Sequence, residues 1–323
     1  MLSRACSNAP LPKGGTIAGI GSGLVMALLG SGTAIADEGG VSFWLPGQYG
    51  SFAAIPPETG FSMPLVTYAY SGDVSTGQEI DLGGEIRLGI NARYLGQFII
   101  PTYSPDTEVL GGRVAFSLAT IIAYSDVSAD ATLGPLSGST SKDVSGFGDL
   151  YPTAQLFWNN GTHNWMAYVT GAIPVGDYEP DRLTNIGLGH GAIDVGGAYT
   201  YFNPENGWEA SATLGITHNF ENPDTNYTNG DSVHLDWAVS KFLSENWQLG
   251  AVGFAYRQIS DDKGAPAVLD GFRSETYGIG PQIAYSGEFD GRPIYASLRA
   301  YNEFETKNRT EGVGAFFTLS IPF

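Results

Sequence analysis

Two histidines are the side chains in this sequence best suited to general acid–base chemistry. His234 precedes Asp236 by two residues, which places both on one face of an extended strand. His218 lies near the end of an earlier predicted strand. A hydrolase acting on lipid would also need a nucleophile such as serine beside the base, and an acid that orients it. The spacing provides neither, so we expect no catalytic residue and no enzyme activity.

Metal, cofactor and nucleic-acid sites also lack support. The single cysteine is Cys6, and the four histidines show no His-x-x-x-His spacing, so no metal site is predicted. The segment Asp224–Asp231 has the composition of a calcium loop, but Asn229 occupies the position that requires glycine. A net charge of −18 excludes the basic surface that nucleic acid needs. We expect no metal, no cofactor and no nucleic-acid partner.

The elements that would position these residues are strands, because apolar and polar side chains alternate along much of the chain. The alternation continues for about twenty residues before Ile100, and it recurs over 208–220 and 233–239. It predicts twelve strands, at about 61–71, 79–102, 109–126, 144–158, 163–174, 190–203, 207–220, 232–243, 246–260, 272–287, 292–304 and 310–323.

The connections between these strands fall into two classes. Tight turns at 159–162, 203–206, 244–245 and 288–291 mostly alternate with longer polar loops at 127–143, 175–189, 221–231 and 261–271. Two connections on the long-loop side, 72–78 and 305–309, are short. Short turns at one end and long loops at the other are typical of outer-membrane barrels. The predicted fold class is all-β, a transmembrane antiparallel β-barrel of about twelve strands.

The last predicted strand supports a lipid environment, although a soluble sandwich could also end on such a strand. One face is apolar and the other carries Gly314, Phe316, Thr318 and Ser320. A bilayer admits strands only as a closed barrel, because strand edges would otherwise remain unpaired. The final strand resembles the signal read by the barrel-insertion machinery. Its candidate residues are Phe317, Leu319, Ile321 and Phe323.

If the apolar parity faces lipid, the polar parity faces the lumen. The candidate lumen-lining residues are Glu85, Arg87, Asn91, Arg93, Asp149, Glu209, His234, Asp236 and Arg299. Charges of both signs either pair to hold the barrel rigid or line a solute path, and the sequence leaves both interpretations open.

Residues 1–60 do not show the pattern of barrel strands. Residues 1–36 have a positive start, an apolar stretch and an Ala34-Ile35-Ala36 cleavage site, which predict a signal peptide removed on export. Residues 37–60 contain three prolines, which disfavour a strand. They are expected to form a periplasmic leader or a plug, ahead of a barrel over 61–323.

Four motifs together resemble the meta-pathway phenol-degradation family of outer-membrane proteins. They are Ser42-Phe43-Trp44-Leu45-Pro46-Gly47, the Pro-Pro-x-x-Gly motif at 56–60, the segment Ser145–Leu150 and the terminal strand. The resemblance covers about 41–323. It implies a barrel in the outer membrane of a Gram-negative bacterium that admits aromatic or other hydrophobic compounds.

The expected function is therefore passive uptake of small hydrophobic or aromatic compounds. The alternatives are a structural or surface-interaction barrel with a blocked lumen and, third, an outer-membrane enzyme. The expected partners are outer-membrane lipid and lipopolysaccharide, the barrel-insertion machinery and small hydrophobic solutes.

Overall fold

The computed structural model describes residues 42–80, 84–133, 136–264, 272–289 and 291–320. In this part of the chain no helix is long and apolar enough to cross a bilayer. The strands are β1 (Gly60–Ser62), β2 (Leu65–Ile80), β3 (Gly84–Ile99), β4 (Thr102–Ser104), β5 (Glu108–Val109), β6 (Gly112–Leu133), β7 (Leu136–Phe147), β8 (Tyr151–Asn160), β9 (His163–Ala172), β10 (Ala192–Asn203), β11 (Trp208–Asn219), β12 (Ser232–Phe242), β13 (Trp247–Gln258), β14 (Glu275–Phe289), β15 (Arg292–Lys307) and β16 (Glu311–Ser320).

Twelve of these strands form a closed antiparallel barrel, which confirms the predicted fold class. Each neighbour along the wall is antiparallel, β16 pairs with β2, and β6 closes the sheet by pairing with both β3 and β8. The first half of β6 pairs with β8, and the second half pairs with β7. Strands β7 and β8 therefore follow one course along β6, interrupted at 148–150.

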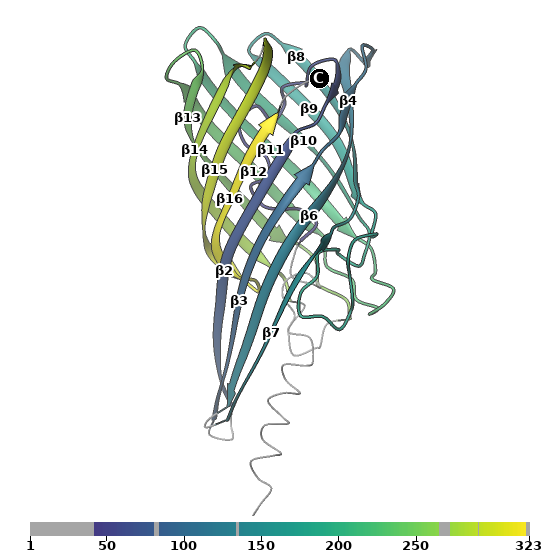
Figure 1. Cartoon of the computed structure of the whole chain (residues 1–323), viewed down its shortest axis with the longest axis vertical. Coiled ribbons are helices and arrows are strands. Elements are labelled where there is room, and N and C mark those ends of the chain that lie inside the picture. Colours follow the sequence, from purple (N-terminus) through teal and green to yellow (C-terminus); the bar gives the residue numbers. More distant parts are fainter. Residues whose placement is uncertain (1–41, 81–83, 134–135, 265–271, 290, 321–323) are drawn as a thin grey trace, which may run out of the picture.

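Two predicted loops are strands instead. The loop expected at 127–143 belongs to β6 and β7, and the connection expected at 72–78 belongs to β2. Strands β2, β3, β6 and β7 consequently extend beyond the other strands at the lower end of the view (Figure 1). The prediction was wrong because the buried residues of this hairpin, such as Ala129 and Ala131, are small. Small residues alternating with Ser, Asp and Thr have the low hydrophobicity of a loop.

The outer surface of the barrel carries large apolar side chains on most strands. They include Leu95, Leu118, Ile122, Trp165, Val169, Val195, Leu214, Ile216, Leu249, Ile283, Leu298, Val313 and Phe317, all more than two-fifths exposed. A soluble protein rarely exposes so much contiguous apolar surface, whereas a barrel in lipid requires it. The wall is therefore built to span a membrane.

The last strand has the two faces that its sequence predicts. Val313 and Phe317 point outward, while Phe316 is buried inside the barrel. Phe316 packs there with Leu45, Phe254 and Tyr301. Ile321 and Phe323 lie outside the described residues, and the role of this strand in membrane insertion stays a prediction.

Candidate functional site

The barrel interior contains a segment of the chain itself, residues 42–57, which we call the inner segment. Trp44 is buried and stacks on the His234 ring, with 3.4 Å between the ring centroids. Leu45 to Gln48 form a turn closed by a 3.1 Å bond from the Gln48 amide to the Leu45 carbonyl. Pro46 and Gly47 suit this turn, because proline fixes the first central residue and glycine accepts a φ of +83° at the second.

Two carboxylates on neighbouring strands bind the backbone of the inner segment. Asp236 on β12 accepts the amide protons of Gly47 at 2.8 Å and Tyr49 at 3.1 Å. Glu209 on β11 accepts the Phe52 amide proton at 3.0 Å and the Ser51 hydroxyl proton at 2.6 Å. Bonds to charged groups are the stronger ones, at about 1.5 kcal/mol or more each, and removing their donors would leave two buried carboxylates without partners.

Donors on β15 bind the same turn from the other side. The Arg299 guanidinium donates to the carbonyls of Gly47 at 3.2 Å and Gln48 at 3.1 Å. The Tyr301 hydroxyl also donates to the Gly47 carbonyl, at 3.0 Å. Glu209, Asp236 and Arg299 are thus brought together around one segment of the chain. Their positions indicate that they hold this segment in the lumen.

His234 pairs with a residue that the sequence reading missed. Its Nε2 lies 2.8 Å from Asp194 on β10, which also accepts a bond of 2.6 Å from the Thr217 hydroxyl. Asp236, the acid that shares a strand face with His234, binds the inner segment instead. The sequence did offer a signal, because Asp194 on β10 alternates with the apolar residues Ile193 and Val195, which face outward.

The polar residues of β3 are a correction to the expected lumen. Asn91 and Arg93 are exposed and share the outer face with Leu95, while Tyr94 and Phe98 face inward. Asn91 is level with the first residue of β16, through Asp73. Arg93 is level with Val313, through Ser71, so these two polar residues lie at the edge of the apolar belt. A long polar side chain there can extend out of the lipid. The side chains of Glu85 and Arg87 lie outside the described part of the structure.

A cavity of about 390 Å³ lies between the inner segment and one side of the wall. Its lining is mostly apolar and aromatic. It includes Trp44, Leu45, Tyr49, Val66, Tyr94, Phe98, Ala119, Ile121, Tyr151, Phe157, Leu188 and Phe316, with Gln48, Thr153 and Gln155 among the polar groups. Apolar lining with a few polar groups is the usual character of a small-molecule site. The sequence reading missed this lining because it assigned the aromatic parity of β3 to lipid.

The connection between β9 and β10, residues 173–191, folds inward and is called the inner loop. Asp149 accepts the amide protons of Gly176 and Leu188, both at 2.8 Å. Thr184 bonds to Ser125 on β6 at 2.7 Å. Ile186 and Leu188 line the cavity. The expected lumen residue Asp149 therefore holds this loop in place.

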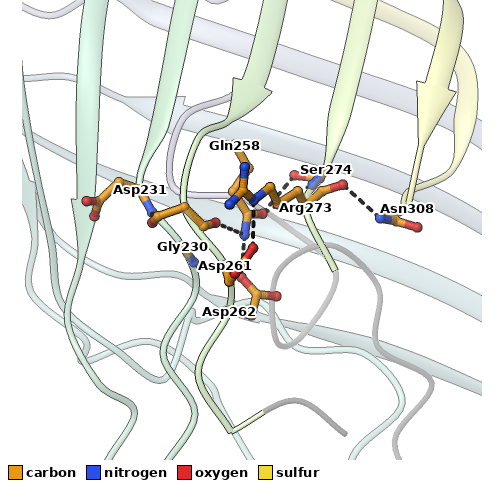
Figure 2. A network of polar contacts seen from close by, with 9 residues as sticks. Gly230, Asp231, Gln258, Asp261, Asp262, Arg273, Ser274 and Asn308 are labelled. Carbon is orange, nitrogen blue, oxygen red and sulfur yellow. Dashed lines mark hydrogen bonds and ion pairs between the residues drawn. The ribbon is translucent and has the colours of Figure 1, made fainter. Parts of the chain in front are cut away.

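A second polar network joins the loops at the end of the barrel opposite the tight turns (Figure 2). Asp262 is buried there and accepts protons from the Gly230 amide at 2.7 Å, the Gln258 amide at 2.5 Å and the Tyr227 hydroxyl. Arg273 pairs with Asp261 at 2.6 Å. Burial raises the pKa of Asp262 above its ordinary 3.8, although the three hydrogen bonds oppose that shift.

This shift predicts that Asp262→Asn stabilises the loops at neutral pH. A carboxyl with a raised folded-state pKa stabilises the folded form below pH 3.8, and that contribution is lost as pH rises through the folded pKa. Asparagine stays neutral throughout. The measurement is amide exchange at Gly230: the variant should exchange more slowly than the wild type at pH 7, and the difference should shrink at pH 4. Faster exchange in the variant at pH 7 would show that bonding to the carboxylate outweighs its burial.

The comparisons with known proteins agree with this architecture. The family model described as "Putative MetA-pathway of phenol degradation" matches residues 71–319, which excludes the inner segment. No curated protein matches the chain. The COG4313 outer membrane channel from Pseudomonas putida F1 is similar in structure at 15% identity. It has a TM-score of 0.60, over 84% of this chain and 98% of that one.

Two further solved structures are more distant. A FadL homologue from Pseudomonas aeruginosa is similar at 9% identity with a TM-score of 0.44, over 90% of this chain and 97% of that one. The CymD monoaromatic hydrocarbon channel is similar at 9% identity with a TM-score of 0.42, over 92% and 98%. The fold is that of an outer-membrane barrel, as the likeness to the COG4313 channel shows.

Proposed function

We propose that this chain, which belongs to the MetA-pathway phenol-degradation family, is an outer-membrane channel for passive uptake of small hydrophobic or aromatic compounds. The observation that carries the proposal is the apolar cavity of about 390 Å³ inside a barrel whose outer face suits lipid. A dry apolar cavity of about 150 Å³ binds benzene, so this one has room for a molecule of one or two rings.

The family description supports an aromatic solute, and the neighbour supports a channel. The family description names phenol degradation, and the neighbour with the same fold is described as an outer membrane channel. The channel needs no catalytic step. His234 is paired with Asp194 and covered by the Trp44 ring, which favours a structural part for this histidine.

A structural or surface-interaction barrel is the second candidate, because the inner segment occupies much of the lumen. Residues 37–60 would then act as a plug.

Three further partners are expected both for a channel and for a structural barrel. Lipid contacts the apolar belt, lipopolysaccharide surrounds the outer loops, and the insertion machinery reads the terminal strand around Phe317.

The test is uptake by liposomes that carry lipopolysaccharide in the outer leaflet, because hydrocarbons cross simple lipid unaided. We expect a small aromatic hydrocarbon to enter faster than into empty liposomes, while a small sugar does not. Sugar uptake as well would indicate a general pore. Uptake of neither would support the structural barrel.

A further inference from the structure

The seated inner segment has two chemically different sides. One side is bound by polar groups of β10, β11, β12, β14 and β15, through the bonds described above and through Thr200 and Gln282. The opposite side faces the apolar cavity against β2, β3, β6 and β8. In the described residues it makes two hydrogen bonds to that wall, from Gln155 to the Tyr49 hydroxyl at 3.4 Å and from the exposed Arg113 to the Pro57 carbonyl at 3.0 Å. A solute moving on the polar side would have to replace the bonds to Asp236, Glu209 and Arg299, whereas one on the apolar side would meet only these two.

We propose that solutes cross between the inner segment and the β2–β3–β6–β8 wall while the segment stays bound to β11, β12 and β15. The segment is then a fixed half of the path and not a plug that leaves. This inference rests on the proposed channel function. An apolar solute cannot replace the bonds that Asp236, Glu209 and Arg299 make, so it offers no compensation for releasing the segment.

The ends of the path follow from the cavity lining. At the tight-turn end, Pro64 before β2 and Ser320 at the end of β16 border the large cavity. Toward the outer loops a smaller cavity of about 50 Å³ is bordered by Tyr68 and Thr184. Ser42, Leu45 and Tyr94 border both cavities, so they form the constriction between them.

A reversible disulfide tests whether the segment must leave. The Ser51 and Ser240 hydroxyl oxygens lie 3.0 Å apart, so Ser51→Cys with Ser240→Cys places two sulfurs within bonding reach. Cys6 is the chain's one native cysteine, and Cys6→Ser removes it where residues 1–36 are retained. Mass spectrometry establishes the bond, and aromatic uptake into lipopolysaccharide-bearing liposomes is measured before and after reduction. We expect equal rates in the two states.

A matched pair of bulky substitutions tests the path itself. Ala119→Trp on β6 fills the apolar cavity, whereas Leu118→Trp adds the same ring to the outer face one residue away. We expect Ala119→Trp to reduce aromatic uptake at least about tenfold, because the added ring raises the barrier to passage through the cavity. Leu118→Trp should leave uptake unchanged. Retained heat-modifiable mobility on gels shows that each variant folds as a barrel.

The outcomes separate the two claims. Uptake that is lost in the oxidised double-cysteine protein and restored by reductant overturns the inference alone, since the segment must then move. Normal uptake by folded Ala119→Trp also overturns it, because the path then lies elsewhere. Absence of aromatic uptake by the unaltered protein overturns the channel function, and the inference with it.

Discussion

Removing residues 42–57 is expected to turn the barrel into a water-filled pore that passes sugars and ions. About eight strands enclose an interior that side chains can fill, and about sixteen leave an aqueous channel, so a twelve-stranded barrel without its inner segment should be open. Ions crossing the present apolar lining lose several kcal/mol of hydration. Because 1.4 kcal/mol is a factor of ten, conductance should rise by at least about tenfold.

Single-channel conductance in planar bilayers measures this effect, with sugar uptake by liposomes as a second readout. Asp236→Ala combined with Glu209→Ala serves as the matched variant that keeps the whole chain. It removes the four bonds to carboxylates, so it should give intermittent openings and not a permanent pore. Unchanged conductance after deletion would show that the inner loop closes the barrel without help from the inner segment.

The strands of the wall could be predicted from the sequence because each one shows its own local pattern of apolar and polar residues. Period-two patterning and the alternation of tight turns with loops give twelve strands, and the parity of β11 and β12 puts Glu209, His234 and Asp236 on the face that is buried in the structure. The prediction of which β3 residues face the lumen failed because side-chain polarity alone does not tell which face of a strand points inward. Tyr94 and Phe98 face an apolar cavity inside, so the usual rule of polar-in and apolar-out reverses there.

The site could not be predicted because its contacts join distant parts of the chain. Gly47 meets Asp236 across 189 positions, and Phe52 meets Glu209 across 157. No period or spacing in either region reports such a contact. The one local signal was the Pro46-Gly47 pair, which predicts a turn but not its position. The three prolines of 37–60 disfavoured a strand, but they did not distinguish a periplasmic leader from a plug.

Gly47→Ala is expected to dislodge the turn of the inner segment and make the channel leak. A Cβ at Gly47 would lie 2.8 Å from a Tyr301 ring carbon and 3.1 Å from Phe254, and both rings are buried. The φ of +83° adds backbone strain of about 1 kcal/mol or more for a residue with a side chain. Together these effects oppose the Asp236, Arg299 and Tyr301 bonds to the same residue.

The matched control for Gly47→Ala is Gly161→Ala, which separates the clash from the strain. Gly161 also has a positive φ, +63°, but a Cβ there would meet nothing within 4 Å. We expect raised ion conductance and faster proteolysis of residues 42–57 in Gly47→Ala, and wild-type behaviour in Gly161→Ala. Wild-type conductance in Gly47→Ala would mean that the rings yield to the added methyl group, and that the bonds from Asp236, Arg299 and Tyr301 hold the turn in spite of it.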